Sequence, residues 1–308
     1  MTSNISNPSD IAQPLPVRSI LQEYYRITKP RVVGLIMFTA VAGMFLAVPG
    51  MPNPLTVFLA TLGIGLSAAA GAAVNHVLDE EKDAQMKRTR NRPIPTGRLE
   101  TGSALIFACV LAGMSMIILS VTVNVLTSLL TFASLIGYAV IYTVFLKHAT
   151  PQNIVIGGAA GAMPPVLGWT AMTGELSSDA FLLFLIIFCW TPPHFWALAL
   201  YRHLDYEKAE IPMLPVTHGQ KFTRLHILLY TVLLVAVSIM PFATGLFGLP
   251  YLAAALILGV IFIAFAIQLF RNYSDDLSRK MFRFSIQYLA LLFAVMLFDH
   301  YLSIILTF

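Results

Sequence analysis

Long apolar segments alternate with short polar ones along most of the chain. Each apolar run is about 20 residues long, which is the length that an α-helix needs to cross the hydrocarbon core of a bilayer. The pattern predicts an all-α, polytopic transmembrane bundle. Its nine helices are expected near residues 31–48, 55–77, 103–122, 126–146, 153–172, 180–201, 225–245, 250–270 and 285–306. Residues 1–30 then form an N-terminal cytoplasmic tail and residues 31–308 one membrane domain.

The composition supports a membrane protein. Of the 308 residues, 57% are apolar and 11% are charged, whereas soluble domains carry about 25% charged residues. Both cysteines, Cys109 and Cys189, lie within apolar runs and predict neither a disulfide nor a metal site. The first seventeen residues contain no Lys or Arg, which argues against a signal or transit peptide and favours a bacterial inner membrane.

The charges test the helix layout independently. If successive helices alternate in direction, one side receives the N-terminus and the loops near 78–102, 147–152, 202–224 and 271–284, which together hold all 19 Lys and Arg. The other side receives only Glu175, Asp179 and Asp299. The positive-inside rule makes the basic side cytoplasmic and leaves the C-terminus outside. The net charge of +4 therefore needs no nucleic-acid partner.

The first candidate for chemistry is the segment 75–98, NHVLDEEKDAQMKRTRNRPIPTGR. Asn75, Asp79 and Asp83 are spaced at i, i+4 and i+8, which places them along one stripe of a helix. Such oxygen ligands suit Mg²⁺, and the basic residues that follow suit a phosphate group. The spacing is also compatible with an ion-paired helix end that leads into a basic cytoplasmic loop.

A second loop, YRHLDYEKAEIPMLPVTHGQK at 201–221, again mixes acids and bases at the cytoplasmic end of an apolar helix. The two mixed clusters follow the second and the sixth predicted helices. This placement is expected if two groups of helices face each other across a cavity.

The chain resembles the UbiA-type membrane prenyltransferases. The resemblance rests on TKPRVVGLIMFTA at 28–40, the segment 75–98, GGAAGAMPPVLGW at 157–169, WTPPHFWALAL at 190–200 and DYEKAEIPMLPVTHG at 205–219. The first acidic block is similar to the superfamily as a whole. The blocks at 190–200 and 205–219 are similar to the branch that prenylates haem.

This resemblance implies a helical bundle around a central cavity, Mg²⁺ as cofactor, farnesyl diphosphate as donor and haem B as acceptor. The implied product is the hydroxylated, farnesylated haem O used in terminal oxidase assembly. The implied partners are membrane lipid and, transiently, a terminal oxidase or a haem-modifying enzyme. The implied catalytic and metal-binding residues are Asn75, Asp79, Asp83 and Asp205.

The candidate diphosphate-binding residues follow from their positions: Lys29 and Arg31 flank Pro30, Arg88 and Arg92 lie beside the Pro93–Pro95 turn, and Lys147 and Lys208 are further basic residues of the cytoplasmic loops. Membrane topology alone would also explain most of these residues.

The second acidic motif departs from the superfamily pattern. Many relatives carry a second Asp four residues after the first, but here Asp205 is followed at that spacing by Ala209. A second metal site built from two aspartates is therefore not expected, although Glu207 or Glu210 could substitute.

His194 is the candidate haem ligand. It lies within an apolar helix directly after Pro192 and Pro193, where the helical hydrogen bonding is interrupted. The flanking rings of Trp190, Phe195 and Trp196 could stack on the porphyrin or stabilise a cation, so Trp190 and Trp196 are haem-binding candidates as well. The alternative is a histidine that is hydrogen-bonded to a neighbouring helix, although ionisable residues within a membrane are functional by default.

Two other functions remain compatible with the residues. A prenyltransferase with an aromatic acceptor, such as a hydroxybenzoate, would share the first acidic motif. A transporter would also use intramembrane Pro, Gly and acidic residues, but it would need no diphosphate chemistry.

Overall fold

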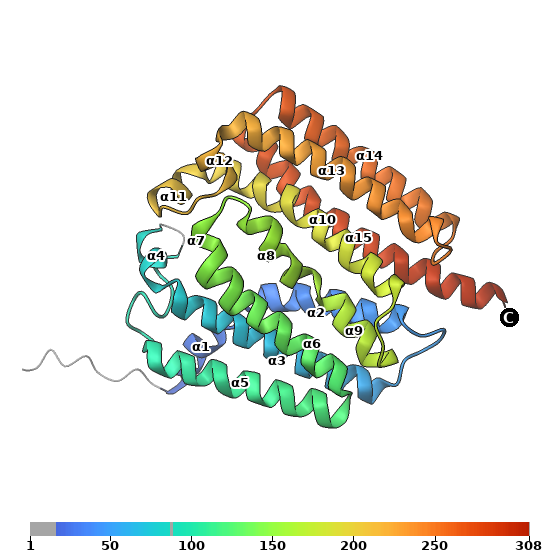
Figure 1. Cartoon of the computed structure of the whole chain (residues 1–308), viewed down its shortest axis with the longest axis horizontal. Coiled ribbons are helices and arrows are strands. Elements are labelled where there is room, and N and C mark those ends of the chain that lie inside the picture. Colours follow the sequence, from blue (N-terminus) through green and yellow to red (C-terminus); the bar gives the residue numbers. More distant parts are fainter. Residues whose placement is uncertain (1–16, 87–88, 308) are drawn as a thin grey trace, which may run out of the picture.

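The computed structural model describes residues 17–86 and 89–307, and every regular element within them is a helix (Figure 1). The elements are α1 (Val17–Ile27), α2 (Pro30–Leu46), α3 (Pro54–Leu78), α4 (Glu80–Gln85), α5 (Thr101–Thr122), α6 (Val125–Ile136), the π-helix η1 (Gly137–Leu146), α7 (Lys147–Ala149), α8 (Asn153–Ala162), α9 (Pro164–Thr173), α10 (Ser178–Tyr201), α11 (His203–Lys208), α12 (Leu214–Thr217), α13 (Gly219–Ala243), α14 (Leu249–Arg271) and α15 (Asp275–Thr307).

The predicted all-α membrane bundle is confirmed. In the described part of the chain, 8 helical segments are long and apolar enough to cross a bilayer. Two of them are composite, because α6 continues into η1 and α8 continues into α9. A further span is formed if α1 and α2, which meet at a bend of 49°, are counted together, and the total is then 9.

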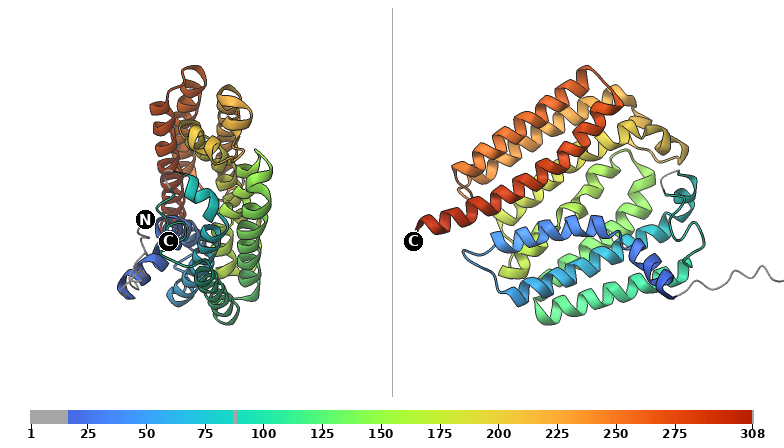
Figure 2. Two further views of the ribbon diagram at one scale, coloured as in Figure 1. Left: turned by 90° about the vertical axis from the view of Figure 1, so that its left-hand side faces the viewer. Right: turned by 180° about the vertical axis from the view of Figure 1, so that it is seen from behind.

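The short polar helices lie together at one edge of the bundle. Figure 1 shows α4, α7, α11 and α12 at the same edge, with the C-terminus at the opposite one. The reverse view in Figure 2 shows α15 running along the length of the bundle to that far end. This arrangement agrees with the separation of the charges along the sequence.

Two helices approach at backbone distance where α2 crosses α9. A Cβ atom on Gly168 would lie 1.9 Å from the Ala40 carbonyl oxygen, and one on Gly43 would lie 2.2 Å from that of Pro165. Only a residue without a side chain fits at such a contact, as is common between membrane helices.

The largest cluster of buried apolar side chains lies around the C-terminal helices. There α10 packs on α13 and α15, and α14 packs on α13 and α15 as well. Asp299, predicted to lie on the outer side, accepts backbone N–H groups of Gly248 at 2.6 Å and Tyr251 at 3.2 Å. It therefore caps the start of α14 and has a structural role.

Three boundaries differ from the prediction. The helix that carries Asn75 ends at Leu78 and restarts at Glu80, so residues 75–83 are not one straight helix. The helices α13 and α15 begin at Gly219 and Asp275, several residues before the predicted spans. Their first turns are polar and extend beyond the apolar segment, so a hydropathy count leaves them out.

Candidate active site

Asp79 and Asp83 occupy the break between α3 and α4. The backbone N–H of Asp79 donates to Asn75 O at 3.1 Å, and that of Asp83 donates to Asp79 O at 2.8 Å. The i to i+4 hydrogen bonds therefore continue through the break. As a result, Asn75, Asp79 and Asp83 stay close together, and all three side chains are buried.

Three basic side chains from separate segments converge on this acidic group. Lys147 Nζ lies 2.5 Å from Asp79 Oδ2, and Arg92 Nη1 lies 2.5 Å from Asp83 Oδ2. Lys29 donates to Asn75 Oδ1, and Asn75 Nδ2 donates to Asp79 Oδ2 at 2.8 Å. The structure thus joins six of the residues expected to bind metal or diphosphate into one network.

Lys29, which donates to Asn75, lies among the charged groups of this network. Burial of its ammonium group, followed by repulsion from Arg92, lowers the pKa of Lys29 to about 7. An anion bound beside it would favour the charged form and raise this pKa again.

The acidic group fits a hard divalent cation. Asp79 Oδ1 is buried and has no hydrogen-bond partner, although buried polar atoms are nearly always paired. No three His, Cys, Asp or Glu residues of the described chain gather into a metal-binding group. Two carboxylates and one amide are a set that Mg²⁺ completes with water and phosphate oxygens.

Two tyrosines of η1 line the same region. Their rings, Tyr138 and Tyr142, are stacked at 5.7 Å with an interplanar angle of 17°, and the Tyr138 ring lies against α3 at Gly71, one turn before Asn75, where an added Cβ atom would be 3.3 Å from the ring. The Tyr142 ring packs where Gly157 has no side chain, since a Cβ atom there would lie 2.2 Å from the ring. The i, i+4 spacing of the two tyrosines already places them on one face of a helix, but only the fold shows that this face meets α3 and α8.

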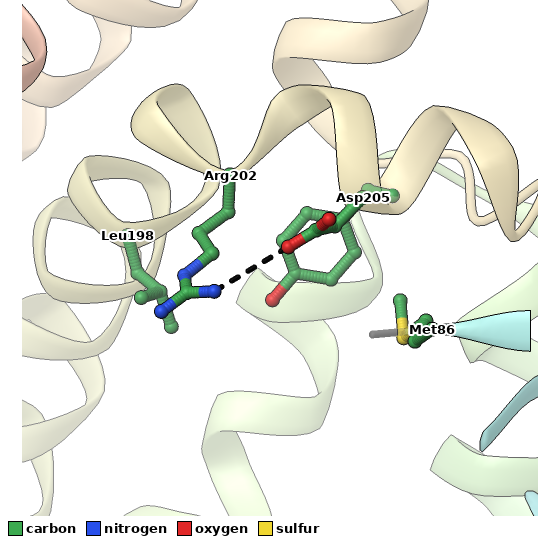
Figure 3. Close-up of a pocket in the computed structure, with 5 residues that line it drawn as sticks. Met86, Leu198, Arg202 and Asp205 are labelled. Atoms are coloured by element: carbon green, nitrogen blue, oxygen red, sulfur yellow. Dashed lines mark hydrogen bonds and ion pairs between the residues drawn. The ribbon is translucent and has the colours of Figure 1, made fainter. Parts of the chain in front are cut away.

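Asp205 does not join the Asp79 and Asp83 group. It pairs with Arg202, with 3.4 Å between Arg202 Nη1 and Asp205 Oδ2. The two line a pocket of about 60 Å³ together with Met86, which follows α4. Figure 3 shows Arg202 and Asp205 facing one another, with Met86 approaching from the other acidic loop. The two loops therefore meet, but Asp205 as a metal ligand stays a prediction.

Two further predicted phosphate ligands, Arg31 and Lys208, are not part of the network. Arg31 and Lys208 are exposed, and Arg88 lies outside the described residues. For Arg31 and Lys208, no contact with the acidic group within the described chain supports that role, and all three assignments stay predictions.

His194 is buried between α10 and α15. Its ring stacks on Trp190 at 4.2 Å and on Phe282 at 4.6 Å, and its Nδ1 lies 2.6 Å from Ser285 Oγ. The hydrogen bond to a neighbouring helix, which was the alternative expectation, is therefore present. It leaves Nε2 as the ring nitrogen available to a ligand.

Trp190 and Trp196 lie on different faces of α10. Trp190 Nε1 donates to Ser285 O at 2.7 Å beside His194. Trp196 is fully buried, and its ring meets the Tyr230 ring edge-on at 5.3 Å, on the side of α13. The structure brings Trp190 to His194 and turns Trp196 away from it.

Sequence reasoning did not single out Arg279, Phe282 and Arg283 of α15. They lie near His194 and Tyr201, with the Phe282 ring against His194 and Arg279 over the Tyr201 ring at 5.3 Å. The only signal was the basic character of the loop 271–284, which membrane topology explains equally well.

Comparison with known proteins identifies the fold and the family. The profile of the UbiA prenyltransferase family matches residues 36–296. A protoheme IX farnesyltransferase of Nitrosospira multiformis is 60% identical over 284 residues, which cover 92% of this chain and 95% of that protein. One of Thiobacillus denitrificans is 60% identical over 283 residues, covering 92% and 95%.

Two solved structures share the architecture. A digeranylgeranylglyceryl phosphate synthase superimposes with a TM-score of 0.78 at 18% identity, covering 92% of this chain and 99% of that one. A UbiA homologue from Archaeoglobus fulgidus, bound to DMAPP and Mg²⁺, superimposes with a TM-score of 0.60 at 16% identity, covering 89% and 99%. The helical arrangement and the match along most of the sequence agree: the chain belongs to the UbiA prenyltransferase family.

Proposed function

We propose that this protein transfers a farnesyl group from farnesyl diphosphate to a vinyl group of protohaem IX and that water adds to the same vinyl group, which gives haem O. The observation that carries the donor half is the network of Asn75, Asp79 and Asp83 with Lys29, Arg92 and Lys147. The acceptor is supported by the relatives named as protoheme IX farnesyltransferases.

The donor site offers the diphosphate two kinds of stabilisation: a metal ion held by the carboxylates and hydrogen bonds from basic side chains. Mg²⁺ held by Asp79 and Asp83 would neutralise part of the charge that develops on the leaving diphosphate. Lys147 and Arg92, which pair with the carboxylates here, lie where they can donate to phosphate oxygens instead. Their charges favour cleavage of the bond between the farnesyl C1 and oxygen, with the electron pair leaving on the diphosphate.

The cation left on the farnesyl group needs a surface that stabilises it without reacting. The stacked Tyr138 and Tyr142 rings beside α3 supply aromatic faces, which attract cations. The terminal vinyl carbon of the acceptor forms the new bond to C1, and positive charge moves to the carbon beside the porphyrin. Water adds there and loses a proton, which completes the hydroxyethylfarnesyl group.

The acceptor is proposed to lie on the side of His194. The Nε2 atom of His194 would face the haem iron, while the two faces of the imidazole ring stay packed against Trp190 and Phe282. Ser285 fixes the ring orientation through Nδ1. Trp196, on the other face of the helix, serves the packing of α10 on α13.

Localisation follows from the same layout. The protein crosses the membrane several times, and its relatives are bacterial. We infer an inner-membrane protein with the donor network on the cytoplasmic side, because the basic loops lie there.

The experiment that tests this function offers two acceptors at once. Purified protein receives labelled farnesyl diphosphate and Mg²⁺ with equimolar haem and 4-hydroxybenzoate, and the products are separated by reverse-phase chromatography. We expect label only in a haem of increased hydrophobicity, and none when Mg²⁺ is chelated. Label in the benzoate would make this an aromatic prenyltransferase, and donor that stays intact under all conditions would contradict prenyl transfer.

A further inference from the structure

A cavity of about 630 Å³ opens between the end of α10, the start of α11 and the first turns of α15. Its basic and aromatic lining consists of Tyr201, Arg202, His203, Arg279, Phe282 and Arg283. Asp205 and Asp275 also line it. Its volume lies within the range of sites that hold organic ligands of the size of a cofactor, about 300–1,000 Å³.

The carboxylates of this cavity are already engaged. Asp205 pairs with Arg202 at 3.4 Å, and Asp275 Oδ1 accepts a hydrogen bond from the Tyr273 hydroxyl at 2.6 Å. Among the described residues, Arg279 and Arg283 have no carboxylate oxygen within 4.0 Å. The two guanidinium groups therefore have no direct ion-pair partner in the described chain, and the exposed Asp276, whose charge acts on both, pairs with Lys280.

The basic side chains of the cavity lie next to a row of aromatic rings, Tyr201 and Phe282, that extends to His194. Arg279 and Arg202 both lie over the Tyr201 ring, at 5.3 Å and 5.7 Å. The Tyr201 ring lies 6.3 Å from the Phe282 ring, and Phe282 lies 4.6 Å from the His194 ring. A lining that combines guanidinium groups with aromatic rings suits a ligand that carries negative charge at one edge of an apolar ring.

We propose that this cavity binds the propionate edge of the porphyrin acceptor. Arg279 and Arg283 donate to the two propionate carboxylates, and the macrocycle lies against Phe282 on the path to His194. The vinyl groups of protohaem lie at the other edge of the ring and so point away from the arginines, into the protein. This assignment rests on the proposed function, because it deepens the acceptor site.

The test compares haem with its dimethyl ester, in which both propionates are uncharged. Binding to the purified full-length protein is followed by spectral titration for the wild type, Arg279→Gln, Arg283→Gln and the double variant. Lys280→Gln is the matched control, because Lys280 lies on the same helix, carries the same charge and pairs instead with Asp276 at 2.7 Å.

We expect each arginine variant to weaken haem binding about tenfold, which is the effect of losing one charge-assisted hydrogen bond. The double variant weakens it further, and Lys280→Gln leaves it unchanged. The dimethyl ester binds the wild type as weakly as haem binds the double variant, and the arginine substitutions do not change its affinity.

The proposal is overturned if the wild type binds haem and its dimethyl ester equally, or if the arginine variants weaken both ligands alike. Either result would mean that the two arginines bind lipid headgroups or only set the membrane topology. Farnesylation by the wild type is measured on the same preparation. Turnover with equal binding of both haems would reject the propionate site alone, whereas absence of any farnesylated haem would reject the proposed function.

Discussion

Asp79 is the residue on which the donor chemistry depends most. Its Oδ2 accepts from both Asn75 and Lys147, while its buried Oδ1 has no partner. We predict that Asp79→Asn or Asp83→Asn lowers the rate of farnesyl transfer by about a hundredfold or more, the usual cost of removing an electrostatic stabiliser. Each substitution preserves shape and removes one negative oxygen ligand.

The matched control for this prediction is Glu81→Gln, because Glu81 lies in the same short helix but is exposed. It should retain the wild-type rate. Initial rates are measured at limiting Mg²⁺, and insertion is checked by the amount of folded protein purified from membranes. A near-normal rate for Asp79→Asn would remove Asp79 from the metal site.

His194 is predicted to serve the acceptor and not the donor. His194→Ala removes the ring between Trp190 and Phe282 and should weaken haem binding at least tenfold. Binding of a non-hydrolysable farnesyl diphosphate analogue should survive. His218→Ala, which changes an exposed histidine, is the control, and both affinities are measured for each variant. Normal haem spectra together with loss of the analogue would reverse the assignment.

At the scale of elements, α2 and α9 cross at backbone contact distance. We predict that Gly168→Ala destabilises the protein by about 1–3 kcal/mol or more, because its Cβ atom would overlap the Ala40 carbonyl and the helices must separate. Gly161→Ala in α8 is the control, since no atom lies within 4 Å of its added Cβ. Thermal unfolding in detergent should show a lower Tm only for Gly168→Ala. Equal Tm values for the two variants would mean that the helices separate without cost.

The helix spans could be predicted because apolar length is a direct consequence of bilayer thickness. The break at Asp79 could not, because the i to i+4 spacing of Asn75, Asp79 and Asp83 is the same in a straight helix and in one that restarts. The side of α10 that carries Trp196 could not be predicted for a related reason: Trp190 and Trp196 are six residues apart on one helix, and only the fold shows which of them faces α15.

The donor site was more predictable than the acceptor site. Asp79, Asp83, Arg92 and Lys147 were all singled out, because acids and bases at the ends of apolar helices are unusual. Lys147 reaches Asp79 from 68 residues away, so the sequence could suggest the contact but not establish it. The basic cavity near Arg279 was hidden, since its residues are the same ones that membrane topology requires.

At the scale of the whole molecule, the separation of charges predicts the orientation. All 19 Lys and Arg belong to one side in the nine-span layout. A reporter that is active only outside the cytoplasm should therefore work when fused after Phe308. The same reporter should be inactive when it is inserted in the loop 78–102. Silence of both fusions would show that the number of spans is wrong by one, and activity of the loop fusion alone would show that the orientation is inverted.

The central claim is that farnesyl transfer ends on the haem vinyl group. The most direct test is mass spectrometry of the haem recovered after purified protein is incubated with protohaem, farnesyl diphosphate and Mg²⁺. We predict a single new haem whose mass is increased by one farnesyl group and one hydroxyl group, with fragmentation placing both on a former vinyl side chain. Haem of unchanged mass, recovered while the donor is consumed, would contradict the account.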